Sequence, residues 1–375
     1  MRHKSRNSNI ELLRIISMFL IVLHHFAIHG IFNSHIVIAN LTINKMLAEF
    51  LIIGGKIGVD LFVLIMGYFL IDSNFKIKKV FQLETQILTY SIGISIVFVL
   101  LKYVNISMSA VIKTIFPVIT NSYWFVTSYI IIYMIFPIIN KIIKSLNKRS
   151  NVKILITLII LLFFLPTFFN LKVGVSNIGT FLTMYYMGAM IKIYSSKYNI
   201  GKMGYRLLLG NLTFSIIGFA SLNLAGILFN IEQFLNKSTH FFDDNSVFML
   251  GIAVGLFLIF LNKKEFSNKY INFIASLSFG VYLIHDNFLM RPILWNNIFH
   301  VHTLLKLNPV VFVLAAFLIT FVIYVVCSLI DMVRLLFISK IFNGSILNKL
   351  FNEIWNLIYP IIVKILKFFR LVNDK

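Results

Sequence analysis

Charged residues are scarce in this chain, and their scarcity excludes most soluble folds. Asp, Glu, Lys and Arg make up only 13% of the 375 residues, whereas 59% are hydrophobic. Soluble domains carry about 25% charged residues, and the mean hydropathy here is +0.90. The composition therefore predicts an all-α, polytopic bundle of transmembrane helices, with no large soluble domain beside it.

Cysteine and acidic residues are also rare. The single cysteine, Cys327, excludes an intramolecular disulfide and a cysteine-based metal site. Only 13 acidic residues stand against 34 lysines and arginines, which gives a net charge of +21. In a soluble protein this excess would point to nucleic acid, but in a membrane protein it is typical of cytoplasmic loops. We therefore expect the lipid bilayer, and no nucleic acid, as the partner of this charge.

Apolar windows of about 20 residues predict about ten spans. Lysines and arginines gather in alternate connections, beginning with the N-terminal segment, so both termini are expected in the cytoplasm. The end of the chain has apolar residues at helical spacing followed by basic ones, which is typical of a helix on the inner leaflet. We expect a transmembrane domain over 1–335 and a cytoplasmic amphipathic tail over 336–375. The expected spans lie near 10–30, 49–72, 82–103, 123–143, 152–170, 177–194, 206–228, 246–262, 270–290 and 308–333.

The first expected span carries ionisable residues that a lipid-facing helix would avoid. Arg14 and His25 are separated by 11 positions, which places them on one helix face about 16 Å apart along the axis. A centrally placed arginine costs on the order of 2.5–3.5 kcal/mol on insertion scales. A polar cavity inside the bundle is expected to offset this cost. Glu11, three residues before Arg14, can pair with it and hold its orientation.

His25 is the first candidate catalytic residue. An ionisable group within a span indicates function by default, and histidine suits a general base near neutral pH; the alternative is a histidine that serves packing alone. No metal is expected, because His24, His25 and His29 do not converge from one helix face and no acidic or thiol partner stands beside them. Asp60, in the glycine-rich second span, differs from His25 in depth by only about 5 Å. It is a candidate to orient the His25 ring.

Basic residues near the cytoplasmic side are candidates for holding an anionic donor. Arg14 can clamp a phosphate or a carboxylate, or it can extend its guanidinium to the lipid headgroups. Lys78 and Lys79 precede the third span, where anchoring at the inner leaflet explains them fully.

Three further residues lie near outer span ends. Trp124 begins the fourth expected span, in the interfacial zone where tryptophan is common in any case. His285 and Arg291 flank the end of the ninth span together with Asp286. These side chains either are solvated or line an acceptor site that faces outward.

Together these segments resemble the acyltransferase 3 family of integral membrane proteins, in order, from about residue 8 to 330. Arg14 and His25 match the family's Arg–x10–His pattern, and Met66 stands where the second-span block commonly has serine. Gln82 departs from the family, because an arginine is expected in that cluster. The other blocks that resemble the family are GVDLFVLIMGYFLI (58–71), SYWFVTSYIIIYMIFPIIN (122–140), FLTMYYMGAMI (181–191) and SLSFGVYLIHDNFLMRPILW (276–295).

The resemblance implies a multi-pass enzyme of the cell membrane, an O-acetyltransferase. It would move an acetyl or similar acyl group from acetyl-CoA to a hydroxyl of a cell-surface or lipid-linked polysaccharide, as in capsule or cell-wall modification. The acyl-CoA is a substrate, and no cofactor is expected. In this interpretation, the catalytic residues are His25 and Asp60, the donor-binding residues are Arg14, Lys78 and Lys79, and the acceptor-side residues are Trp124, His285 and Arg291.

Two rival functions involve no acyl transfer. A transporter or exporter of a glycan or small anion could use Arg14 and His25 as a coupling pair, but the sequence has no inverted repeat or paired broken helices. A glycan polymerase would be expected to have a large outer loop, whereas the outer connections here stay below about 20 residues.

Overall fold

The computed structural model describes residues 6–32, 42–103, 107–171, 177–195 and 200–342, together with Pro360, and side chains as far as Phe337. Every regular element in these ranges is a helix, which confirms the expected all-α fold. The beginning of the expected tail continues the last helix to Phe342. Pro360 aside, the rest of that tail lies outside the described residues, so its amphipathic character stays a prediction.

The chain is a bundle of membrane-spanning helices. Within the described ranges, eight helices are long and apolar enough to cross a membrane. A helix pair bent by 89°, Lys269–His285 with Met290–Lys306, would make a ninth. The expected span at 177–194 forms α9 (Asn177–Tyr194), which is not among these nine. A polytopic bundle is thus confirmed, while the count of ten and the cytoplasmic termini remain predictions.

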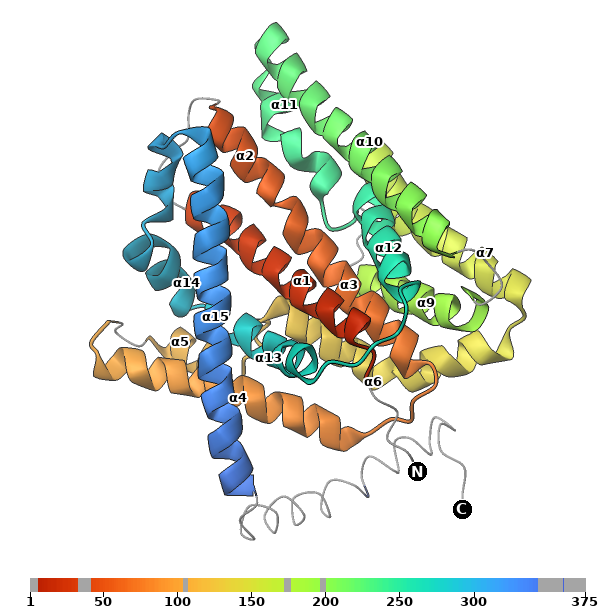
Figure 1. Cartoon of the computed structure of the whole chain (residues 1–375), viewed down its shortest axis with the longest axis horizontal. Coiled ribbons are helices and arrows are strands. Elements are labelled where there is room, and N and C mark those ends of the chain that lie inside the picture. The colour runs from red at the N-terminus through yellow and green to blue at the C-terminus, as the bar shows by residue number, and fades with distance from the viewer. Residues whose placement is uncertain are drawn as a thin grey trace.

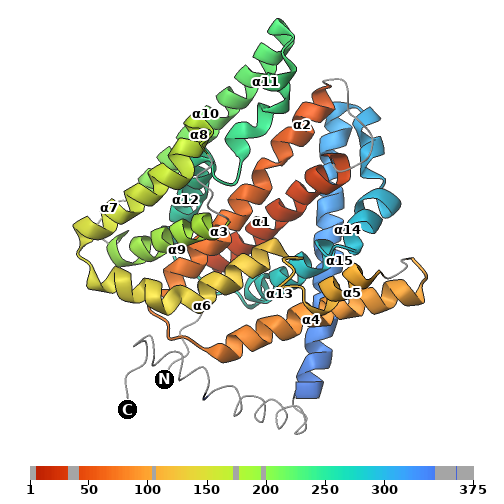
Figure 2. The same ribbon diagram turned by 180° about the vertical axis from the view of Figure 1, so that it is seen from behind.

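Helix α1 (Ser8–His25) lies in the middle of the bundle (Figures 1 and 2), where it contacts α3 (Ile53–Leu70), α12, α13 (Lys269–His285) and α15. It begins after Asn7, whose side chain accepts a hydrogen bond from the Asn9 backbone N–H at 3.0 Å. Such a cap satisfies an N–H that the helix itself leaves unpaired. Its central position explains how α1 can carry polar side chains, because protein rather than lipid surrounds it.

Glycines allow α3 to lie close against its neighbours. A Cβ atom on Gly58 would lie 2.5 Å from the Ser17 carbonyl oxygen of α1. A Cβ on Gly67 would overlap the backbone of Tyr185 in α9. Small residues at such crossings let helix backbones approach within a membrane. The glycines therefore fix the spacing between α1 and α3, and with it the width of any cavity between them.

The other helices complete the bundle around this core. They are α2 (Ile43–Leu51), α4 (Ile77–Leu100), α5 (Met108–Ile115), α6 (Trp124–Ser145), α7 (Lys148–Ile159), α8 (Leu165–Phe169), α10 (Ile200–Phe229), α11 (Glu232–Asn236), α12 (Val247–Leu261), α14 (Met290–Pro292) and α15 (Pro309–Phe342), with the π-helices η1 (Phe26–Phe32), η2 (Ile160–Phe164) and η5 (Ile293–Ile298) and the 3₁₀ helices η4 (Ser238–Phe242) and η6 (Val301–Lys306).

Candidate active site

The helical geometry changes at His25. Helix α1 ends there and continues directly as the π-helix η1. π-helical turns are rare and occur frequently at functional sites. The ring centroids of His25 and His29 lie 4.8 Å apart, and those of His24 and His25 lie 5.4 Å apart. The change of helix type thus gathers three imidazoles at one end of α1.

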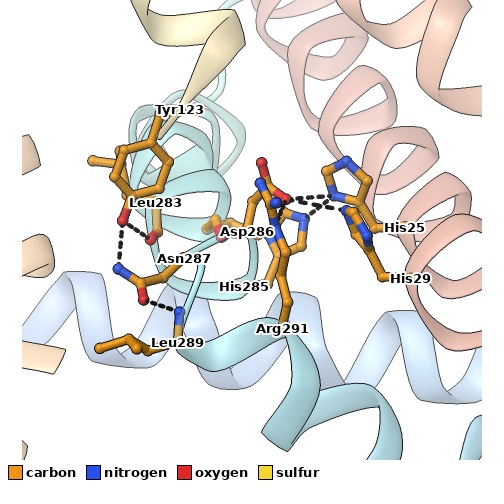
Figure 3. A network of polar contacts seen from close by, with 10 residues as sticks. His25, His29, Tyr123, Leu283, His285, Asp286, Asn287, Leu289 and Arg291 are labelled. Atoms are coloured by element: carbon orange, nitrogen blue, oxygen red, sulfur yellow. Dashed lines mark hydrogen bonds and ion pairs between the residues drawn. The ribbon is translucent and has the colours of Figure 1, made fainter. Parts of the chain in front are cut away.

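A chain of two hydrogen bonds fixes the protonation of His25 (Figure 3). The Nδ1 of His285 lies 2.6 Å from the carbonyl oxygen of Val281, which can only accept, so this nitrogen carries a proton. In a neutral ring, the Nε2 of His285 is then an acceptor. It lies 2.8 Å from the Nδ1 of His25, which must therefore donate. The remaining nitrogen of His25, Nε2, is left unprotonated and points away from these contacts (Figure 3).

A buried carboxylate lies beside this pair. The Oδ1 atom of Asp286 accepts a hydrogen bond from the Nε of Arg291 at 2.7 Å. The same oxygen lies 3.6 Å from the Nδ1 of His25 and 3.5 Å from the Nε2 of His29. Asp286 has no exposed surface, so it needs a charged partner, which Arg291 supplies. The carboxylate is also placed to stabilise a proton on either histidine.

These positions correct one alternative drawn from the sequence. Residues 285–287 are completely buried, so the idea that His285 and Asp286 are solvated is wrong. Arg291 retains 26% exposure of its side chain. Whether His285 and Arg291 contribute to an acceptor site stays a prediction, but both belong to the hydrogen-bonded surroundings of His25.

Asn287 connects the end of α13 to the start of α6. Its amide donates to the Tyr123 hydroxyl at 2.8 Å, and that hydroxyl donates to the Leu283 carbonyl oxygen at 3.0 Å (Figure 3). The Asn287 oxygen accepts from the backbone N–H of Leu289 at 2.9 Å. Backbone groups at a helix break need such partners within a membrane. These contacts therefore hold the turn that carries Asp286.

Asp60 does not form the contact with His25 that was expected from the sequence. In the described ranges no hydrogen bond or ion pair joins Asp60 to His25; the carboxylate beside His25 is that of Asp286. Asp60 is buried, and one of its oxygens lacks a hydrogen-bond partner among the described residues. The charged groups that act on it electrostatically are Asp244 and Lys56. The expected orientation of His25 by Asp60 is thus corrected, and a catalytic role for Asp60 stays a prediction.

The expectation of no metal rested partly on a missing acidic partner, and that reason is wrong. One ligand atom each from His25, His29 and Asp286 lie within 4.8 Å of one another. However, the Oδ1 of Asp286 already accepts from Arg291, and the Nδ1 of His25 already contacts His285. The other carboxylate oxygen of Asp286, Oδ2, has no hydrogen-bond partner among the described residues, so the absence of a metal stays a prediction.

A cavity of about 180 Å³ opens beside the three histidines. Helices α1, α3, α6 and α13 and the connection before α12 supply its walls. Trp124, predicted for the acceptor side, is one of the lining residues. Lys56 and Asp244 form an ion pair of 2.6 Å at this cavity. Neither residue was predicted as part of the site, although a lysine inside an apolar span was an available signal. The lining residues are Ile21, His24, His25, Ile28, His29, Gly55, Lys56, Val59, Trp124, Phe125, Asp244 and Tyr282.

A second cavity, of about 410 Å³, lies at the other end of α1. Arg14 lines it, and its guanidinium lies 3.6 Å from Glu11, which confirms the expected pair. Arg6 and Lys192 line the same cavity and were missed by the sequence analysis. The expected donor-side lysines lie nearby at the start of α4, both exposed. The structure places one of them, Lys79, close enough to Arg14 for their charges to repel.

The match to known proteins covers nearly all of these elements. A family model described as an acyltransferase domain matches residues 7–329, which include both cavities except for Arg6. Comparisons with curated proteins and with solved structures found no match.

Proposed function

Since the chain belongs to the acyltransferase 3 family and is a membrane acyltransferase, we propose that it moves an acetyl or similar acyl group from acyl-CoA to a hydroxyl of a cell-surface or lipid-linked glycan. The observation that carries the proposal is the buried hydrogen bond of 2.8 Å between the Nδ1 of His25 and the Nε2 of His285, which leaves the Nε2 of His25 as the acceptor of the neutral ring. His25 also lines a cavity.

This arrangement suits general-base catalysis. The Nε2 of His25 takes the proton from the acceptor hydroxyl as the oxygen attacks the thioester carbonyl carbon. The new C–O bond forms, the C–S bond breaks, and the proton passes from His25 to the departing thiolate, which leaves as the CoA thiol. During the reaction His25 is an imidazolium, and the carboxylate of Asp286 lies 3.6 Å from its Nδ1. A fixed negative charge beside the positive charge that develops on His25 stabilises the transition state and so lowers the activation barrier.

The two ends of α1 have different roles in this proposal: the end with Arg14 binds the donor, and the end with His25 activates the acceptor. Arg14 would hold phosphates of the donor in the larger cavity, where Arg6 and Lys192 add positive charge. Arg14 and His25 lie about 16 Å apart along the helix. The thioester of CoA is well separated from its nucleotide phosphates, so this spacing suits one donor molecule extended along α1.

The test measures transfer of label from acetyl-CoA to glycan in membrane vesicles. His25→Ala should abolish transfer while the protein remains folded in the membrane. His302→Ala is the matched control, because His302 lies in η6 and lines neither cavity. Full transfer by the His25→Ala variant would overturn the mechanism. Export of unlabelled glycan without any transfer would favour the transporter instead.

A further inference from the structure

We propose that Lys56, Asp244 and Trp124 form a binding subsite for one uncharged sugar unit, in the cavity beside His25. The inference rests on the proposed function, because it identifies the class of acceptor that this function would use. Within the part of the chain that the structure describes, no hydrogen bond, ion pair or ring contact joins any of the three to His25 or His285, so they represent a separate part of the site.

The subsite joins elements that are distant in the chain. Lys56 lies in α3 and Asp244 lies in the connection before α12, yet Nζ and Oδ1 are 2.6 Å apart. The Asp244 side chain is 44% exposed and the Lys56 side chain 20% exposed. Both groups therefore remain accessible to a ligand although they already pair with each other. Trp124, at the start of α6, lines the same cavity.

The chemistry of these groups matches a sugar ring. A carboxylate accepts hydrogen bonds from hydroxyls and an ammonium donates to them, and such charge-assisted bonds are the stronger ones. Trp124 offers an aromatic surface for the apolar C–H face of the ring. The cavity volume is about 180 Å³, and a cavity of about 150 Å³ binds one benzene ring. That space suits one sugar unit and is too small for several.

His24 adds a second acceptor to this subsite. Its Nδ1 lies 2.7 Å from the carbonyl oxygen of Ile52 and therefore donates, which leaves Nε2 as an acceptor in the neutral ring. A Cβ atom at position 55 would overlap the His24 ring, so Gly55 makes room for it. The ring is thus held between α1 and α3 in one tautomer.

The charges favour a neutral ligand over an anionic one. The single positive charge of Lys56 is matched by the carboxylate of Asp244. A phosphate or a uronate placed here would therefore meet a carboxylate and no surplus of positive charge. An uncharged hexose or N-acetylhexosamine can use both partners of the pair without adding charge. We therefore assign the subsite to uncharged sugars.

Tryptophan fluorescence tests the subsite without measuring catalysis. The chain has three tryptophans, and Trp124 lines the cavity. Two uncharged tetrasaccharides, one of hexose and one of N-acetylhexosamine, are added separately to the purified full chain in lipid nanodiscs. At least one of these two tetrasaccharides should change the tryptophan emission. A glucuronate tetrasaccharide should bind at least tenfold more weakly. Trp124→Phe should remove the signal.

Two carboxylate variants sharpen the test. Asp244→Asn should weaken binding of the uncharged sugar at least tenfold. Asp243→Asn is the matched control, because the neighbouring Asp243 lines a different cavity, and binding should stay within twofold. The proposal is overturned if no uncharged sugar binds, if glucuronate binds as tightly, or if Asp244→Asn binds like the unchanged protein. Sugar binding without acetyl transfer would instead uphold the subsite and refute the proposed function.

Discussion

Two substitutions of His285, by glutamine and by asparagine, distinguish the effect of its contact with His25 from the effect of its contact with Val281. Glutamine can place its amide where the ring Nε2 lies, within reach of the Nδ1 of His25. Asparagine is shorter by one methylene and places its amide where the ring Nδ1 lies, near the Val281 oxygen. The two variants therefore share their chemistry and differ in whether His25 keeps its partner.

The structure sets the size of the expected effect. The His25–His285 hydrogen bond is 2.8 Å long and buried, and an unsatisfied buried donor costs about 1–3 kcal/mol. If that cost appears in the transition state, His285→Asn lowers kcat by about 5- to 150-fold. The KM for acetyl-CoA should not change, because His285 does not line the donor cavity. His285→Gln should keep most of the rate.

Steady-state transfer from labelled acetyl-CoA measures both constants, and nitrogen NMR of labelled histidine reports the tautomer of His25. We expect the Nδ1-protonated form in the unchanged protein and in His285→Gln, and a mixture in His285→Asn. The reasoning is refuted if folded His285→Asn keeps kcat within twofold. Equal loss in both variants would also refute it, since His285 would then serve only packing.

Three other predictions concern charge and packing. Asp286→Asn should destabilise the protein by about 3 kcal/mol, because Arg291 would lose its buried counter-ion. Thermal unfolding tests this for the single variant and for the double variant that also carries Arg291→Gln. Only the double variant should recover the Tm of the unchanged protein. Arg14→Gln should raise the KM for acetyl-CoA about tenfold, equivalent to about 1.4 kcal/mol. Arg14→Lys should raise this KM by a smaller factor. An unchanged KM in both variants would show that Arg14 does not belong to the donor site. Gly58→Ala should cost about 1–3 kcal/mol through overpacking, because its Cβ would lie 2.5 Å from a backbone oxygen of α1. Gly93→Ala, with nothing within 4 Å, is the control and should be neutral or slightly stabilising in the same unfolding assay.

Local features of the site were predictable from the sequence. Helices in a membrane follow from runs of apolar residues, since backbone groups in lipid must be paired within the helix. The pairing of Glu11 with Arg14 needs only the three-residue spacing, and the structure has it at 3.6 Å. The close contact of glycines with neighbouring helices was also predictable, because glycine is small enough to let two helices approach.

Contacts between distant segments were not predictable in this way. His25 and Asp286 are far apart in the chain, and their approach depends on the rotation of α1 against α13 and on the break after α13. Depth alone favoured Asp60, but the charged groups that act on Asp60 are Lys56 and Asp244. The spacing of apolar residues does not determine which face of a mostly buried helix is directed toward a given neighbouring helix.

The π-helix that follows His25 makes the site sensitive to the number of residues as well as to their kind. A π-helix forms its hydrogen bonds one residue further along the chain than an α-helix does. Removing one residue between His25 and His29 would leave a segment whose length suits α-helical hydrogen bonds, so the π turn would be lost and His29 would stand three residues after His25 instead of four. His29 would then turn away from Asp286 although no polar side chain had been lost. In genetic terms, an in-frame deletion of a single codon there would be as damaging as replacement of a histidine.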